Sequence, residues 1–153
     1  MDGKFDSRHP LVGLVDENSR LTGRLKSVFA ESRQSVGLND SEIMVLNAVV
    51  EADQPPTVAQ IGRSLGHARQ LIQRAANSLR DAGLIELADN PDHKRAPLLL
   101  PSDEGIALKR ETDSRAEEIA EQLMPALDEN GVREATVALR ALRKQLETRL
   151  RAG

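Results

Sequence analysis

The fold of this chain is decided by residues 57–105, TVAQIGRSLGHARQLIQRAANSLRDAGLIELADNPDHKRAPLLLPSDEG. The stretch opens with a capping box, Thr57 followed three residues later by Gln60, which predicts the start of a short helix. Gly66 is placed to end that helix, and a second helix is expected over 68–82. Two short helices joined by a tight turn that contains glycine are typical of a helix-turn-helix.

The sequence pattern changes after this second helix. Two short apolar runs, 84–87 and 96–100, are separated by a polar segment, 89–95, that contains a proline. This arrangement predicts a β-hairpin, with Pro97 at an edge where its missing N–H does no harm. A hairpin after a helix-turn-helix indicates a winged helix-turn-helix, whose second helix enters the major groove of DNA while the hairpin lies at the minor groove.

Further helices are expected on both sides of this core. The predicted elements are one helix over 10–36 that stops at Gly37, one opened by a capping box at Asn39–Glu42 and ended by Pro55-Pro56, one capped at 102–104 that runs to about Met124 before Pro125, and one from about Gly131. The predicted fold class is therefore mainly α: a winged helix-turn-helix with long N- and C-terminal helices and a two-stranded wing.

The first and last helices carry apolar stripes that one small core cannot cover. These stripes consist of Leu11, Leu14, Val15, Leu21, Leu25, Val28 and Phe29 in the first helix, and of Leu139, Leu142, Leu146 and Leu150 in the last. We expect them to be buried in a homodimer, with packing inside one chain as the alternative. The expected organisation is an N-terminal dimerisation helix over 1–37, a DNA-binding region over 38–103 and C-terminal dimerisation helices over 104–153, together forming one intertwined domain.

The helix over 68–82 has two faces when it is wound at about 100° per residue. The predicted inner stripe is Leu71, Ala75 and Leu79, with Ile72 and Ala76 beside it. The predicted DNA-binding side chains are Gln70, Gln73, Asn77 and Arg80 with the flanking Arg69 and Arg74, and Lys94 and Arg95 at the tip of the hairpin. Amide side chains can pair with adenine, and arginine with guanine or phosphate. An ordinary amphipathic helix with a polar outer face is the plainer alternative.

Composition and charge narrow the class of protein. The chain has 153 residues, 29% of them charged and 39% hydrophobic, and no cysteine, so thiolate chemistry and disulfides are excluded. The net charge of −3 argues against nucleic acid, but residues 63–80 contain four arginines and no acidic residue. The polar N-terminus and the absence of an apolar run of about 20 residues predict a cytoplasmic protein with no membrane partner.

No pattern in the sequence predicts an enzyme. His9, His67 and His93 share no metal-ligand spacing, and there is no phosphate loop, dinucleotide fingerprint or Ser-His-Asp order. We therefore expect no catalytic residues, no metal and no cofactor. A winged-helix module that binds proteins rather than DNA remains as an alternative function.

Residues 40–105 resemble the DNA-binding core of the MarR family. The resemblance rests on the Leu-x-x-x-Gly-Leu-Ile step over 79–85, the Asn-Pro-Asp-His-Lys-Arg wing tip over 90–95 and the Pro-Ser-Asp-Glu-Gly helix start over 101–105. The chain departs from the family pattern at Ala68, where a capping Ser or Thr is common, so that His67 or Gly66 must provide the cap. It also departs at the wing tip, where His93 replaces an acidic residue, and at the helix start, where Pro-Ser replaces Leu-Thr.

The resemblance implies a repressor that binds an inverted-repeat operator as a homodimer. It also implies that a small aromatic or lipophilic ligand, bound between the DNA-binding and dimerisation regions, releases the DNA. Leu14, Phe29 and Met44 are candidate lining residues for such a ligand, with core packing as the plainer role of each.

Overall fold

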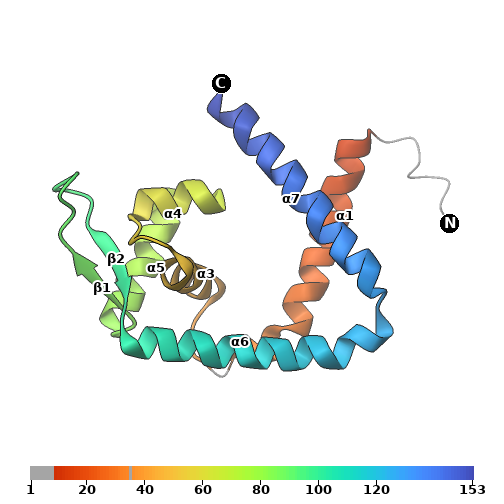
Figure 1. The fold of residues 1–153 in the computed structure, drawn as a ribbon, viewed down its shortest axis with the longest axis horizontal. Coiled ribbons are helices and arrows are strands. Elements are labelled where there is room, and N and C mark those ends of the chain that lie inside the picture. Colours follow the sequence, from red (N-terminus) through yellow and green to blue (C-terminus); the bar gives the residue numbers. More distant parts are fainter. Residues whose placement is uncertain (1–8, 35) are drawn as a thin grey trace. The chain divides into compact units, whose positions relative to one another are not determined.

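The computed structural model describes residues 9–34 and 36–153 and divides the chain into two compact units, one ending at residue 116 and one covering 117–153. The first unit contains α1 (Pro10–Val28), α2 (Ala30–Gln34), α3 (Asp40–Glu51), α4 (Val58–Leu65), α5 (Arg69–Asp81), β1 (Ile85–Ala88) and β2 (Leu98–Pro101) (Figure 1). Helix α6 (Asp103–Leu123) begins in the first unit and ends in the second, which also contains the 3₁₀ helix η1 (Met124–Ala126) and α7 (Glu129–Arg151). The predicted mainly helical winged helix-turn-helix is confirmed.

Both predicted capping boxes are present. The side chain of Asn39 accepts a hydrogen bond from the backbone N–H of Glu42 at 2.8 Å, and the side chain of Thr57 accepts one from the N–H of Gln60 at 3.2 Å. In each box the third residue returns a side-chain oxygen to the N–H of the cap. Gly66 ends α4 at φ 70°, a conformation that costs glycine nothing and that turns the chain toward α5.

The predicted single helix over 10–36 is wrong, because α1 ends at Val28 and a separate short helix, α2, begins at Ala30. The interruption lies at Phe29. The carbonyl oxygen of Phe29 accepts a hydrogen bond from the hydroxyl of Ser32 at 2.7 Å and another from the N–H of the same residue at 3.2 Å. These local bonds compete with the regular helical pattern, which is a tendency of serine that a count of apolar positions does not register.

The wing, which we define as β1, β2 and the loop between them, is an antiparallel pair in which Ile85 lies opposite Pro101 and Ala88 opposite Leu98. Pro97 immediately precedes β2, so it does not occupy the strand position predicted for it. The N–H of Leu99 donates to the carbonyl oxygen of Pro56 at 2.8 Å. This bond attaches the base of the wing to the segment before α4 and so orients it relative to the helix-turn-helix.

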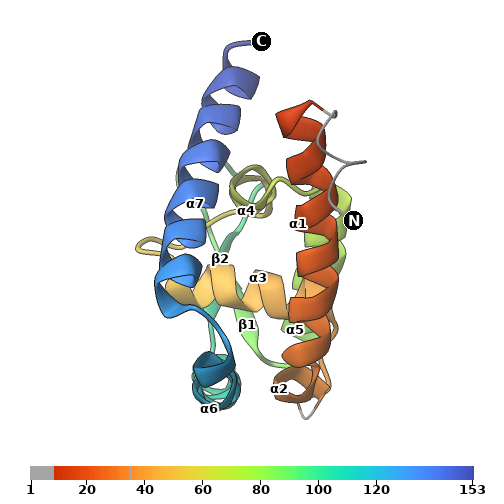
Figure 2. The same ribbon diagram turned by 90° about the vertical axis from the view of Figure 1, so that its right-hand side faces the viewer.

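One hydrophobic core holds α3, α4, α5 and the wing together, and both ribbon views show these elements gathered around it (Figures 1 and 2). Its fully buried members include Val45, Ile72 and Leu79, each with none of its surface exposed. The predicted inner stripe of α5 needs one correction. Leu71 is only half-buried and Ile72 takes the central place, because α5 packs on both α3 and α4 and its buried face is therefore turned toward the side of Ile72 and Ala76.

Hydrogen bonds attach the start of α6 to the turn between α5 and β1. The hydroxyl of Ser102 donates to the carbonyl oxygen of Gly83 at 2.6 Å and accepts from the N–H of Gly105 at 3.1 Å, so Ser102 caps α6 as predicted. Gly105 is buried against the backbone of Leu84. A side chain at position 105 has no room there, which explains the glycine of this helix start.

Helices α1 and α7 have no buried side chains within the part of the chain that the structure describes. Leu21 and Leu25 of α1 are 49% and 47% exposed, and Leu139 and Leu146 of α7 are 40% and 52% exposed. Across residues 9–34 and 36–153, no helix is both long and apolar enough to cross a membrane. Each of the two helices therefore presents an apolar stripe that its own unit leaves in solvent.

Candidate nucleic-acid interface

The outer face of α5 is polar and accessible. Of the six side chains predicted to bind DNA on this helix, five are exposed and one, Asn77, is half-buried. The opposite face supplies four buried residues to the core, namely Ile72, Ala75, Ala76 and Leu79. The apolar face of α5 therefore packs on the core while its polar face is exposed to solvent. A helix needs this arrangement in order to enter a groove of DNA.

Two amides on this face form a pair. The Nε2 atom of Gln73 donates a hydrogen bond to the Oδ1 atom of Asn77 at 3.0 Å, one helical turn away. This bond restricts the rotamer of Gln73. It leaves the side-chain oxygen and one amide hydrogen of Gln73, and the side-chain NH₂ group of Asn77, available to a ligand. A side chain that is already oriented loses less entropy when it binds.

The arginines of the face differ in their partners. Arg80 forms an ion pair with the neighbouring Asp81 at 3.2 Å. Arg69 and Arg74 are exposed and form no ion pair with any residue in 9–34 or 36–153. The half of α5 nearer its N-terminus therefore has the free positive charge, whereas the charge of Arg80 near the C-terminus is already partly neutralised.

The predicted cap of α5 is wrong. The N-cap residue is Ala68 itself, and neither His67 nor Gly66 places a side chain on the first turn. The N–H of His67 instead donates to the carbonyl oxygen of Gly62 at 3.0 Å. The first backbone N–H groups of α5 thus point outward beside Arg69 without a side-chain acceptor, at the positive end of the helix dipole.

Because the first turn of α5 is uncapped, Ala68→Asp should raise the stability of the protein but weaken its binding to DNA. The carboxylate should cap α5 and raise the free energy of unfolding by about 1 kcal/mol, measured in urea. If α5 enters the major groove as predicted, the substitution should also weaken binding to duplex DNA several-fold, because it would place a negative charge near the phosphates. Ala68→Ser is the control, since it adds the cap without the charge. A gain of DNA affinity in Ala68→Asp would contradict the proposed orientation of α5.

The loop of the wing is held by Asn90 rather than by an ion pair. The side chain of Asn90 donates to the carbonyl oxygen of Ala96 at 2.9 Å and accepts from the N–H of Asp92 at 3.1 Å. Lys94 and Arg95 follow in the same loop, exposed and without an ion pair among the described residues. The replacement of an acidic residue by His93 therefore leaves the loop ordered, and both cations remain free.

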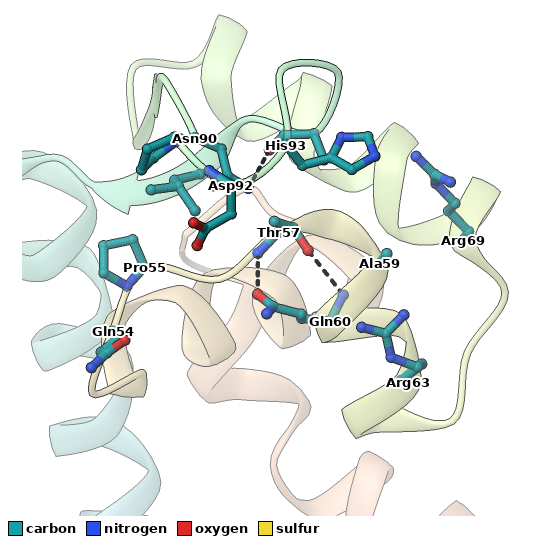
Figure 3. A pocket seen from close by; sticks show the side chains of 13 residues that line it. Gln54, Pro55, Thr57, Ala59, Gln60, Arg63, Arg69, Asn90, Asp92 and His93 are labelled. Atoms are coloured by element: carbon teal, nitrogen blue, oxygen red, sulfur yellow. Dashed lines mark hydrogen bonds between the residues drawn. The ribbon is translucent and has the colours of Figure 1, made fainter. Parts of the chain in front are cut away.

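A hollow of about 560 Å³ lies between α4, the start of α5 and the wing loop (Figure 3). Arg63 of α4, Arg69 of α5 and His93 of the wing all line it. Arg63 belongs to the basic stretch 63–80 but was not among the predicted DNA-binding residues. That stretch was the only signal in the sequence, because its place beside the wing depends on the tertiary structure.

In 9–34 and 36–153, no three His, Asp or Glu side chains gather closely enough to hold a metal ion. Lys109 lies buried between Asp113 and Glu51. Burial lowers the pKa of Lys109, but hydrogen bonds and charge interactions with both carboxylates raise it above its ordinary value of 10.5, so this amine stays protonated and is a poor nucleophile.

Comparison with known proteins agrees with this geometry. A sequence profile of the MarR family matches residues 36–96. An uncharacterized protein from Mycobacterium tuberculosis is 38% identical over 101 residues, which cover 61% of this chain and 71% of that protein.

Two similar solved structures are those of a MarR-family transcriptional regulator from a Rhodococcus species and of a mutant of MarR from Escherichia coli complexed with operator DNA. The first has a TM-score of 0.77 and 17% identity, and covers 89% of this chain and 96% of its own. The second has a TM-score of 0.74 and 16% identity, and the match covers 86% of this chain and 94% of the chain in that structure. At these identities the two structures show a shared fold. Taken with the matching profile over residues 36–96, the helix-turn-helix, the wing and the capped start of α6 show that this chain belongs to the MarR family of winged-helix transcriptional regulators.

Proposed function

We propose that the chain binds an inverted-repeat operator in duplex DNA as a homodimer, with α5 in the major groove and the wing at the minor groove. The observation that carries this proposal is the outer face of α5, where exposed amides and free arginines stand beside a wing loop with two further free cations. Amide and guanidinium groups are the side chains that read base edges most effectively, and arginine also binds phosphate.

The exposed apolar stripes of α1 and α7 support the dimer. A soluble monomer rarely leaves contiguous apolar surface in water, and the burial of that surface against a second copy contributes about 25 cal/mol per Å². We assign dimerisation to residues 1–37 and 104–153 and DNA binding to 38–103. Two-fold symmetry would then present the two α5 helices to successive turns of one face of the duplex, about 34 Å apart.

Repression and its relief by a ligand follow from family membership rather than from a residue of this chain. We propose that the protein represses transcription and that a small aromatic or lipophilic molecule releases it from DNA by favouring a different spacing of the two α5 helices. Of the three residues predicted to line a ligand site, Met44 packs against the hydrophobic core. It therefore has the core-packing role that was predicted as the alternative.

Selection of bound sequences from a random duplex pool tests the proposal. We expect an inverted repeat whose half-site centres lie about 10 base pairs apart, and sedimentation at matched concentration should show a dimer on one duplex. If no sequence is enriched, and if residual binding to duplex DNA does not weaken with salt, the chain is a protein-interaction module instead.

Variants of α5 should separate affinity from base preference. Arg74→Ala removes a free cation and should weaken binding to operator and random duplexes alike. Gln73→Ala should relax selectivity at one base pair by about 1–3 kcal/mol and affect random duplexes little. Asn77→Ala should have a smaller effect of the same kind, because it releases Gln73 from its hydrogen bond at 3.0 Å. Unchanged affinity and selectivity in both Arg74→Ala and Gln73→Ala would remove α5 from the interface.

A further inference from the structure

The hollow between α4 and the wing has a distinctive set of charges (Figure 3). Its lining includes two arginines, Arg63 and Arg69, and the imidazole of His93, but Asp92 is the one acidic residue in it. Arg63 and Arg69 come from consecutive helices and form no ion pair with any residue of the described ranges. The two guanidinium groups therefore remain free to bind an external anion.

Three other polar side chains of the lining, Thr57, Gln60 and Asn90, already form hydrogen bonds inside the protein. Thr57 and Gln60 are bound to each other in the capping box of α4, at 2.9 and 3.2 Å. Asn90 is bound to the backbone of the wing loop at 2.9 Å. A ligand in the hollow would therefore interact mainly with the arginines, which favour phosphate because they donate parallel, charge-assisted hydrogen bonds to it.

We infer that this hollow is a phosphate site and that it receives the sugar–phosphate strand of the operator that separates the major groove from the adjacent minor groove. The inference rests on the proposed function. If α5 lies in one groove and the wing lies at the next, the strand between these grooves has to pass between α5 and the wing. The hollow occupies that interval, lined by Arg69 of α5 and His93 of the wing, with Arg63 contributed by α4.

Arg63 is therefore a DNA-binding residue outside the recognition helix, and it binds without regard to sequence. Asp92 opposes it. Its carboxylate shares the hollow with the arginines and would repel a phosphate bound there. For an assumed separation of about 6 Å in water, Coulomb's law gives roughly a threefold loss of affinity per site. The acidic side chain limits how tightly the site holds any duplex, operator and random sequence alike.

A salt titration with the full-length protein tests this site. Binding of a random-sequence duplex is measured at several chloride concentrations for the wild type, Arg63→Gln, Asp92→Asn and Arg110→Gln. Arg110 is an exposed arginine of α6 that does not line the hollow, so it controls for the change in net charge. Thermal unfolding followed by circular dichroism checks that each variant is folded.

Each bound dimer carries two copies of the hollow, so we expect Arg63→Gln to reduce the slope of log K against log salt by about 2. The ratio of wild-type to variant affinity should therefore be about 60 times larger at 0.1 M salt than at 1 M. The order of preference among operator variants should not change. Asp92→Asn should bind random duplexes about tenfold more tightly, about threefold for each subunit of the dimer, and Arg110→Gln should resemble the wild type. If Arg63→Gln keeps the wild-type slope, or if Asp92→Asn gains nothing, the inference is overturned even when Arg74→Ala still weakens binding and the proposed function stands.

A second arm identifies the source of the phosphate. Inorganic phosphate replaces chloride at constant ionic strength in the same assay. Stronger inhibition of the wild type than of Arg63→Gln would mean that the hollow also takes free phosphate. Equal inhibition, together with the reduced slope of Arg63→Gln, would mean that it takes the DNA backbone alone. Failure of every form of the protein, the wild type included, to bind duplex DNA would overturn both the proposed function and this inference.

Discussion

Gly105→Ala is expected to lower the free energy of unfolding by about 3 kcal/mol, at the upper end of the range for overpacked sites. A Cβ at position 105 would overlap the carbonyl oxygen of Leu84 and would lie 3.1 Å from its carbonyl carbon and 3.4 Å from the Cδ1 atom of Leu46. The first two atoms belong to the backbone and cannot rotate away. Helix α6 would have to move, which would strain the bonds that Ser102 makes to Gly83 and Gly105.

The control for this substitution is Gly23→Ala. Gly23 lies within α1, off its apolar stripe, and a Cβ there meets no atom within 4 Å. Alanine should stabilise the helix by about 0.5–1 kcal/mol. Both variants should be measured in urea at one fixed protein concentration, because dimerisation would make the stability depend on concentration. If Gly105→Ala unfolds within 0.5 kcal/mol of the wild type, α6 does not approach Leu84 as closely as described.

Lys109→Ala is expected to lower the free energy of unfolding by about 3 kcal/mol. The side chain of Lys109 is 8% exposed, and its Nζ atom lies 2.6 Å from Asp113 and 3.0 Å from Glu51, so it connects α6 to the end of α3. Alanine removes both ion pairs and the buried hydrocarbon stem. Lys109→Met, which keeps the stem, should lose only about 1 kcal/mol, because the two carboxylates are more than half exposed and can be hydrated again.

The contribution of the Lys109 charge should depend on pH in a defined direction. Burial lowers the pKa of this amine, but the hydrogen bonds and charges of Asp113 and Glu51 raise it above 10.5 overall. A pKa that is higher in the folded state stabilises the protein fully below the unfolded value, and that stabilisation is lost as the pH rises through the folded value. The difference in stability between the wild type and Lys109→Met should therefore stay constant from pH 7 to pH 10 and shrink above pH 10.5. A difference that already disappears by pH 9 would mean that the ion pairs do not hold Lys109.

Local signals in the sequence were sufficient where one or two side chains determine the backbone. Capping boxes place the starts of α3 and α4 within a residue, since an Asn or Thr followed by Glu or Gln satisfies otherwise unpaired N–H groups within that segment. The same logic failed at Phe29, where the competing hydrogen bond comes from Ser32, a residue with no place in an apolar count. It also failed at Ala68, where no side chain caps α5.

The residues of the candidate DNA-binding site likewise divide into those that a local pattern identifies and those that depend on contacts between remote segments. Helical periodicity alone identified the accessible residues of α5, because the polar and apolar sides of one helix follow from its own sequence. Arg63 could not be identified in this way, since its relevance depends on the hollow between α4 and a wing that is some 30 residues away. The conformation of Asn90 in the wing loop likewise depends on its hydrogen bond to the carbonyl oxygen of Ala96, which no short sequence pattern predicts.

By itself, the sequence determined the order of helices and strands apart from the division of α1 from α2, together with the polar face of α5 and membership in a family, because these properties depend on neighbours along one helix or turn. Only the tertiary structure decided that Ile72 rather than Leu71 is central to the buried face of α5, why position 105 must be glycine, and which arginines stay free of acidic partners among the described residues. Those properties depend on distances between segments that are remote in the chain, and such distances are set by the packing of one shared core rather than by any local pattern.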